Sequence, residues 1–515
     1  MSGGPDAGGA FPAVAAPEPL ALSSGRGRWV LAATVLGSSI ALLDATVVGI
    51  ALPSIGREFH GDVGTLQWVV TGYSLTLAAF LLLGGSLGDR YGRKRIFSVG
   101  VVWFAVASAL CGIAPSAGLL IGARVLQGVG GALLAPGSLA ILQASFRPDD
   151  RARAIGAWSG LGGVAGAAGP LVGGYLIAIG SWRWVFFINL PLAAAVLVIT
   201  ARHVPETRDP TSTGRVDTAG AALAVVFLAG LTYGLIEAPT LGWSSPAVVA
   251  CLVVAAVAAP AFLIVEHRRA QPMLPLRLFR SRQFTGANAV TFAVYGALAG
   301  ALFLLPVELQ IVKGYSPLES GVALLPLTLV MLAFSARSGA LSARIGPRLQ
   351  MTVGPLVVGA GLLLLTRAAD PGSYWTQVLP AVLVFAIGLA VTVAPLTSTA
   401  MGAAPPEHSG VASAINNVVA RAAGLLAVAV LPLLAGLTGA AALSSTELAS
   451  GFRTAMVISS LVCAAGGVLA ALTIRNPVRP PAAAAAAGKE GPRWNCGVSG
   501  PPVNPSLVAA ADRSG

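Results

Sequence analysis

The sequence consists largely of apolar runs of about 20 residues that recur along nearly its whole length. Each run is long enough to cross the hydrocarbon core of a bilayer, which is about 30 Å thick. Only 10% of the 515 residues are charged, whereas a soluble domain carries about 25%, so most of the surface of this protein cannot face water. The sequence therefore predicts an all-α protein that crosses a lipid bilayer many times.

Fourteen membrane spans are predicted from these runs. Their limits are 29–50, 66–86, 96–114, 117–145, 154–179, 184–201, 218–237, 246–265, 284–307, 319–341, 350–367, 376–400, 411–436 and 452–474. Residues 1–25 lack the apolar core of a signal peptide, so we expect the first span to act as the insertion signal.

The basic residues test this count. If the N-terminus is cytoplasmic, 25 of the 32 Lys and Arg residues lie in or beside cytoplasmic segments and 5 lie in outer loops. Lys and Arg concentrate on the cytoplasmic side of membrane proteins. The asymmetry predicts an even number of spans with both termini in the cytoplasm. It also accounts for the net charge of +12 without nucleic acid as a partner.

A ten-residue loop motif occurs twice. Residues 85–94 follow span 2, and the similar residues 339–348 follow span 10, at an offset of 254. Two halves related by such a repeat are typical of transporters. We therefore predict two six-span halves around an inserted pair, with Pro/Ala-rich, disordered cytoplasmic tails. The predicted regions are a tail 1–28, a first half 29–201, an inserted pair with its loops 202–283, a second half 284–475 and a tail 476–515.

The remaining two bases, Arg124 and Arg421, fall inside spans, and so does the acid Asp44. Asp44 in span 1 and Arg124 in span 4 are each six or seven residues from the outer end of their span, so both lie roughly 10 Å below the outer surface. A carboxyl inside a membrane is costly and is by default a functional candidate, here as a group that binds and releases a proton. A purely structural ion pair between the two residues is the alternative.

The loop after span 2 combines glycines, one acid and four bases. The glycines permit a turn and close helix approach, and the bases hold the loop in the cytoplasm. We also expect a conformational latch in which Asp89 reaches the positive N-terminus of a facing helix. The residues assigned to this latch are Gly85, Asp89, Arg90, Gly92, Arg93 and Lys94.

Span 5 is rich in glycine and contains one proline. Small residues let membrane helices pack closely, and the same face can serve static packing or gating. The residues assigned to a gating helix are Gly166, Gly169, Pro170, Gly173 and Gly174.

Aromatic and amide side chains near the centre are candidate substrate contacts, because aromatic faces suit organic cations and flat drugs. These candidates are Trp68, Tyr73, Gln127, Trp158 and Tyr295. Glu237 and Glu308 end spans 7 and 9, where we expect hydrated loop carboxylates. The four cysteines have no metal-site or disulfide spacing. No phosphate loop, nucleophile motif or metal cluster indicates an enzyme, a cofactor or a metal site.

These motifs together resemble the major facilitator superfamily, in particular its 14-span drug:proton antiporters. The stretches that carry the resemblance are residues 43–53, 85–94, 120–131, 166–174, 182–191, 314–317 and 321–326. The resemblance assigns Asp44 and Arg124 to proton coupling, and Asp89 to a latch against span 13. Two positions depart from the family pattern, Ala343 in the second loop motif and Glu308 in span 9.

The resemblance implies a monomeric exporter in the plasma membrane of a bacterium. It would exchange hydrophobic or cationic organic compounds, such as drugs and antibiotics, for protons by alternating access. Two alternatives stay open: an exporter of an endogenous metabolite or amino acid, and a membrane sensor of the same fold that does not transport.

Overall fold

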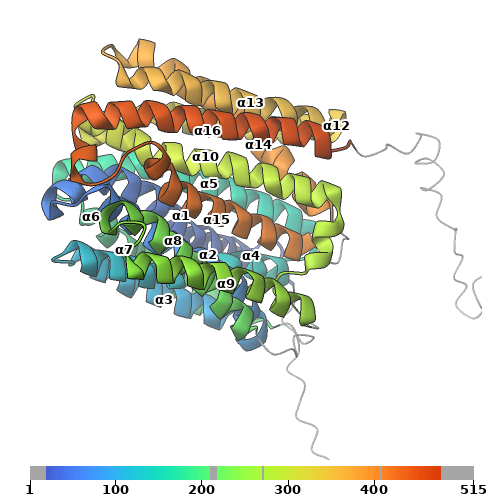
Figure 1. Cartoon of the computed structure of the whole chain (residues 1–515). Coiled ribbons are helices and arrows are strands. Elements are labelled where there is room, and N and C mark those ends of the chain that lie inside the picture. The colour runs from blue at the N-terminus through green and yellow to red at the C-terminus, as the bar shows by residue number, and fades with distance from the viewer. Residues whose placement is uncertain (1–18, 209–216, 270–271, 405–408, 477–515) are drawn as a thin grey trace, which may run out of the picture. The chain divides into compact units, whose positions relative to one another are not determined.

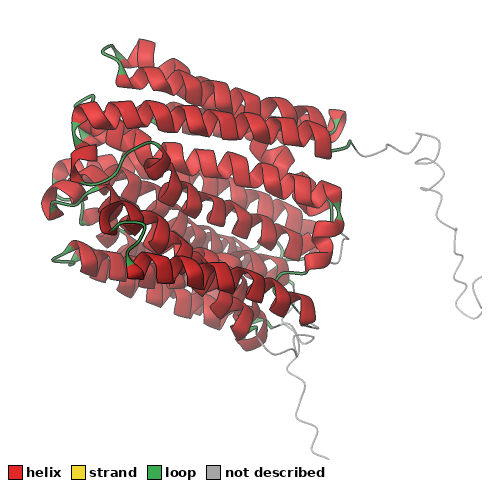
Figure 2. Cartoon of the chain, viewed as in Figure 1, coloured by secondary structure: helices red, strands yellow, loops and turns green. Residues whose placement is uncertain are grey.

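The computed structural model describes residues 19–208, 217–269, 272–404 and 409–476, and the predicted tails lie largely outside these ranges. The described part is helical almost throughout (Figure 2), and its one β-bridge joins Leu20 to Phe146. Fourteen of its helical segments are long and apolar enough to cross a membrane. The predicted all-α fold with fourteen spans is confirmed.

The helices follow the predicted order of spans (Figure 1). The first six spans correspond to α1 Gly25–Phe59, α2 Val63–Tyr91, α3 Arg93–Gly112, α4 Ala117–Ser145, α5 Pro148–Ile179, and α6 Trp184–Phe187 with α7 Asn189–His203. The inserted pair is α8 Thr218–Leu241 and α9 Pro246–Arg268, followed by the 3-10 helix η1 Leu276–Arg280.

The last six spans form the second half. They correspond to α10 Arg282–Ile311, α11 Pro317–Ala323 with α12 Leu325–Ile345, α13 Pro347–Leu365 with η2 Thr366–Ala369, η3 Tyr374–Val378 with α14 Leu379–Gly402, α15 Ser409–Leu434, and α16 Ser445–Thr473 after η5 Ala440–Leu443.

Most helices are longer than the spans predicted for them. The first helix begins where the Ser24 hydroxyl accepts a hydrogen bond from the Gly27 amide, and it ends at His60, whose φ is +49°. The second begins where the Asp62 carboxylate accepts from the Thr65 amide at 2.8 Å. Hydropathy marks only the stretch inside hydrocarbon, whereas caps fix the helix ends in the water-facing layer. The spans are therefore right in number and short in extent.

The predicted turn at residues 85–94 is confined to one residue. Helix α2 continues to Tyr91, so Gly85 and Gly88 are helical, and only Gly92 turns the chain, with φ +111°. A Cβ on Gly92 would also lie 2.7 Å from a Glu206 carboxylate oxygen. That carboxylate accepts hydrogen bonds from the amides of Lys94 and Arg95 at the start of α3. The expectation that several glycines bend this loop is corrected.

Two hydrogen bonds join the two halves toward one end of the bundle. We call this the Asp62 end, after the α1–α2 connection, and the opposite one the Gly92 end, after the α2–α3 turn. Gln67 Nε2 of α2 donates to the Val428 carbonyl of α15 at 2.7 Å. Gln310 Nε2 of α10 donates to the Ile50 carbonyl of α1 at 3.0 Å. Both bonds lie toward the Asp62 end, where they join the two halves.

Glycines bring α2 and α4 into backbone contact. A Cβ on Gly128 would lie 2.1 Å from the Thr76 hydroxyl and 2.2 Å from the Tyr73 carbonyl oxygen. Thr76 also donates to the Val125 carbonyl across the same contact at 2.8 Å. Because small residues allow this approach, the side chains on the facing surfaces of α2 and α4 are held in fixed positions.

This contact generates a stability prediction. Gly128→Ala should lower the thermal unfolding temperature of the full-length protein in detergent by several degrees, because the added methyl group overpacks the α2–α4 contact at a cost of about 1–3 kcal/mol. Gly122→Ala on the same helix is the matched control, since a Cβ there meets no atom within 4 Å. Equal unfolding temperatures for the two variants would show that α2 and α4 do not pack this closely.

Candidate functional site

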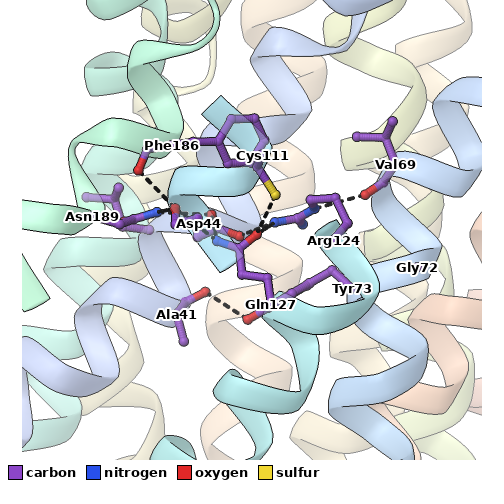
Figure 3. Close-up of polar contacts among 12 residues, drawn as sticks. Ala41, Asp44, Val69, Gly72, Tyr73, Cys111, Arg124, Gln127, Phe186 and Asn189 are labelled. Atoms are coloured by element: carbon purple, nitrogen blue, oxygen red, sulfur yellow. Dashed lines mark hydrogen bonds and ion pairs between the residues drawn. The ribbon is translucent and has the colours of Figure 1, made fainter. Parts of the chain in front are cut away.

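Asp44 and Arg124 form an ion pair inside the first half. An Arg124 terminal nitrogen lies 2.5 Å from Asp44 Oδ2 (Figure 3). Their side chains are 0% and 1% exposed, so neither charge is solvated by water in this conformation. The two residues lie on α1 and α4, and the similar depth deduced from the sequence agrees with this contact. An unpaired charge at this position would cost several kcal/mol.

Two side-chain amides donate to the Asp44 carboxylate, and one hydroxyl group links the two amides. Gln127 Nε2 donates to Asp44 Oδ1 at 2.9 Å, and Asn189 Nδ2 donates to the same oxygen at 3.2 Å. Both amides also contact the Ser108 hydroxyl, at 3.2 and 3.0 Å. Ser108 in turn donates to the Phe186 carbonyl. The Asp44 carboxylate of α1 is therefore bonded directly to α4 and α7 and linked to α3 through Ser108 (Figure 3).

The Arg124 guanidinium contacts groups on α1, α2 and its own helix α4. Its Nε donates to the Val69 carbonyl of α2 at 3.0 Å, and a terminal nitrogen donates to Gln127 Oε1 at 2.6 Å. Its guanidinium carbon lies 4.4 Å from the centre of the Tyr73 ring, which favours a cation–π contact. Loss of the Asp44 charge would leave these partners in place but remove the only carboxylate bonded to Arg124 among the described residues.

Two members of this network were not predicted as site residues. Ser108 lies in an apolar span, and Asn189 lies in the stretch that resembles the family at span 6, without an assigned role. A single amide in an otherwise apolar run was the available signal, because polar side chains within membrane helices usually bond across helices. Which helix each one faces depends on helix rotation, which the sequence pattern left open.

Two of the predicted substrate contacts are part of this network. Gln127 is fully buried between Asp44 and Ser108, and Tyr73 is 2% exposed beneath Arg124. The phenol of Tyr73 donates to the Ala41 carbonyl at 3.4 Å. In this conformation both side chains support the ion pair, and their direct contact with a substrate stays a prediction.

The other three predicted contacts lie apart from one another. Trp68 Nε1 donates to Glu237 Oε1 at 2.7 Å, which ties α2 to the inserted helix α8. Trp158 Nε1 donates to the Ser38 hydroxyl at 3.0 Å. Tyr295 on α10 is half-buried. Substrate contact stays a prediction for these residues, although Trp68 already has a structural role.

The residues of the predicted latch contact their own loop and α7. Asp89 pairs with Arg93 at 2.7 Å, one turn along the chain. Lys94 Nζ donates to the Ala201 carbonyl near the end of α7 at 3.0 Å. Residues 405–408, which precede α15, lie outside the described ranges, so contact of Asp89 with span 13 stays a prediction.

The predicted gating helix α5 contacts both halves. A Cβ on Gly169 would lie 1.9 Å from the Thr46 hydroxyl, and one on Gly173 would lie 2.9 Å from Val47, so this face packs on α1. A Cβ on Gly174 would lie 2.6 Å from the Pro317 carbonyl oxygen of α11. Gly166 is on the α1 face, where its carbonyl accepts from Thr46 at 3.1 Å.

The α5–α11 contact has a second component. A Cβ on Gly321 would lie 2.2 Å from the Pro170 carbonyl oxygen, so α5 and α11 meet with their backbones close together. Glycines on both helices permit this approach. The gating role itself stays a prediction.

Glu237 is half-buried within helix α8 and does not lie in a loop, and the expectation of a hydrated loop carboxylate is also wrong for Glu308. This residue is 0% exposed within α10, and neither of its carboxylate oxygens has a hydrogen-bond partner in the described part of the chain. The helix continues past the predicted end of span 9 to Ile311, which carries Glu308 into the protein interior.

Comparisons with known proteins place the chain in a family. A profile of the Major Facilitator Superfamily matches residues 34–428. The chain is 37% identical to the tetracenomycin C resistance and export protein of Streptomyces glaucescens, over 79% of this chain and 76% of that one. It is 33% identical to the methylenomycin A resistance protein of Streptomyces coelicolor, over 88% and 94%.

Solved structures agree at the level of the fold. A POT family transporter in complex with a thioalcohol-conjugated peptide superposes with a TM-score of 0.66 at 14% identity, covering 89% of this chain and 99% of that one. An inward-facing bacterial homologue of the human lysosomal transporter Spinster gives 0.63 at 19% identity, covering 88% and 97%. The chain is therefore a multi-pass membrane protein that belongs to the Major Facilitator Superfamily of transporters.

Proposed function

We propose that this protein exports hydrophobic organic compounds, including antibiotics, in exchange for protons by alternating access. Relatives over most of its length carry names that denote antibiotic resistance and export. The observation that carries the proposal is the Asp44–Arg124 pair, whose carboxylate is buried and bonded to several helices at once. A titratable group in that position links the gain or loss of a proton to the packing of the first half.

The coupling step would act through Arg124. When Asp44 is ionised, its charge compensates the guanidinium, and Gln127 bonds to both residues. A proton on Asp44 removes that compensation and leaves a buried cation, which is strongly destabilising in a dry environment. The first half would then favour a different packing of α1 against α4. Release of the proton to water would restore the packing described above.

Alternating access would use the contact between the halves. We assign the Asp62 end to the outside and the Gly92 end to the cytoplasm, because Lys and Arg gather at the Gly92 end. The bonds of Gln67 and Gln310 then close the outer side in this conformation. On this assignment the protein lies in the plasma membrane of a bacterium, acts as a monomer and has both termini in the cytoplasm.

The proton-coupling role predicts a loss of export. In a bacterial strain that lacks its own drug pumps, Asp44→Asn should abolish resistance and dye extrusion while the protein still reaches the membrane, because the amide cannot carry a proton through the cycle. The measurements are growth on graded drug concentrations and loss of fluorescence from cells loaded with dye, with and without a protonophore.

Asp370→Asn is the matched control for this experiment. Asp370 also pairs with an arginine, Arg453, at 2.6 Å, but both side chains are 47% exposed and the pair is remote from the buried network. Exposed pairs of this kind contribute about 0–1 kcal/mol. Full resistance with Asp44→Asn would rule out the coupling role. A wild-type protein that extrudes none of a broad panel of compounds would rule out export.

The closed outer side generates a second prediction. Gly174→Val should push α5 away from Pro317 and favour opening of the Asp62 end. A cysteine at Ala45, introduced in a background without the native cysteines, reports the opening. Ala45 is exposed and lies one turn from Gly49, which faces Leu302 of the other half. A membrane-impermeant maleimide added outside intact cells should label it several-fold faster in the Gly174→Val variant.

The control for that labelling is Gly163→Val on the same helix, where a Cβ meets no atom within 4 Å. It should leave the labelling rate unchanged. Equal rates for Gly174→Val and Gly163→Val would mean that the α5–α11 contact does not close the outer side.

A further inference from the structure

A second arginine lies deep in the membrane, in the other half. Arg421 is 12 residues from the start of the 26-residue helix α15, about 18 Å along its axis. Its side chain cannot extend that far, so the guanidinium stays near the middle of the bilayer. A cation at this depth is costly unless it is paired or faces water, and such residues usually mark a transport path.

The described residues supply no partner for Arg421. It makes no hydrogen bond or ion pair with any of them, although its side chain is half-buried. The carboxylate nearest in depth, Asp44, is bonded to Arg124, Gln127 and Asn189. Arg421 is therefore a half-buried cation, and no carboxylate in the described part of the chain compensates its charge.

More distant carboxylates do not compensate it either. Glu237 accepts from Trp68 near the Asp62 end of the bundle. Glu308 is 13 residues beyond Tyr295 on α10, about 20 Å along the helix. Gly296 of α10 lies beside Ala423 of α15, so Tyr295 is level with Arg421 and Glu308 is too far away to pair with it.

Arg421 faces the boundary between the two halves. Antiparallel packing of α2 on α15, fixed by the bond from Gln67 to Val428, places Tyr73 level with Arg421. Parallel packing of α10 on α15 sets Gly296 beside Ala423, so Tyr295 is level with it too. Arg421 is therefore close enough to both phenols for its charge to act on them.

We propose that Arg421 binds an ionised acidic group of the exported compound, and that the transported class therefore includes flat aromatic acids. The proposal rests on the proposed export function and specifies its substrate. A guanidinium offers paired N–H donors that match the two oxygens of a carboxylate, and Tyr295 supplies an aromatic surface beside it. A free cation here disfavours cationic compounds, so this differs from the cationic substrates expected from the sequence resemblance.

A purely structural arginine would look different. Arg337 on α12 is an example, because its guanidinium donates to the Ala333 carbonyl of its own helix at 2.7 Å. Arg124 is another, with a carboxylate, an amide and a carbonyl as partners. Of these three arginines, only Arg421 makes no hydrogen bond to a described residue. It lies at the boundary where the two halves would separate during alternating access.

The test compares two ligands that share one ring system. Full-length protein purified in detergent is titrated with 1-pyrenebutyrate and with its neutral amide, and binding is followed by pyrene fluorescence anisotropy. Wild type should bind the acid at least tenfold more tightly than the amide. Arg421→Gln should weaken binding of the acid at least tenfold and change that of the amide less than twofold. Arg421→Lys, which keeps the charge, should retain part of the preference.

Arg337→Gln is the matched control and should leave both affinities unchanged. Thermal unfolding is measured for each variant to check that the variant is folded. If Arg421→Gln does not fold, Arg421→Lys still tests the proposal. The proposal is overturned if wild type does not prefer the acid, or if Arg421→Gln weakens both ligands equally. Extrusion of other dyes by wild-type cells is measured separately. Absence of that extrusion would reject the export function, whereas failure of the pyrenebutyrate test alone would reject only the role of Arg421 in binding an acid.

Discussion

The ion pair between Asp44 and Arg124 organises the first half of this transporter. Two opposite charges without solvent exposure are stable only when they neutralise each other and their remaining donors and acceptors are bonded. Here those bonds come from Gln127, Asn189 and the Val69 carbonyl, so four helices, α1, α2, α4 and α7, meet at one carboxylate and one guanidinium. A change of a single charge would therefore be felt by the whole half.

The contact between the halves is of a different kind. Its described hydrogen bonds come from two glutamines, Gln67 and Gln310, and its closest approaches involve glycines such as Gly174. In a membrane such packing is held by van der Waals contact rather than by the hydrophobic effect. The halves can therefore separate without unpairing a buried charge, whereas moving α1 away from α4 would break the buried Asp44–Arg124 pair.

The sequence predicted the features that follow from the cost of polarity in hydrocarbon. The fourteen spans and the interior charges Asp44, Arg124 and Arg421 can be recognised because an isolated charge is conspicuous within an apolar run. The partners Ser108, Asn189 and Glu206 were not predicted, because helix rotation decides what a polar side chain meets. Glu308 was misplaced because the end of an apolar run is not the end of a helix.

The two interior arginines constrain how export could be coupled to protons. Arg124 and Arg421 both lie near Tyr73, and among the described residues Asp44 offsets the charge of Arg124 whereas no carboxylate pairs with Arg421. A proton on Asp44 makes this region more positive, which would hold an acidic substrate more tightly. Direct competition between the proton and such a substrate therefore cannot drive the exchange.

The coupling would instead come from conformation and from the membrane potential. On the proposed mechanism, protonation of Asp44 would change the packing of the first half and so shift the side to which the substrate is exposed. A proton moving inward and an anion moving outward both carry positive charge inward. With an inside-negative potential, each charge contributes about 2.3 kcal/mol per 100 mV. One-for-one exchange of an acid for a proton would thus draw on the potential twice per cycle, and exchange of a neutral compound once.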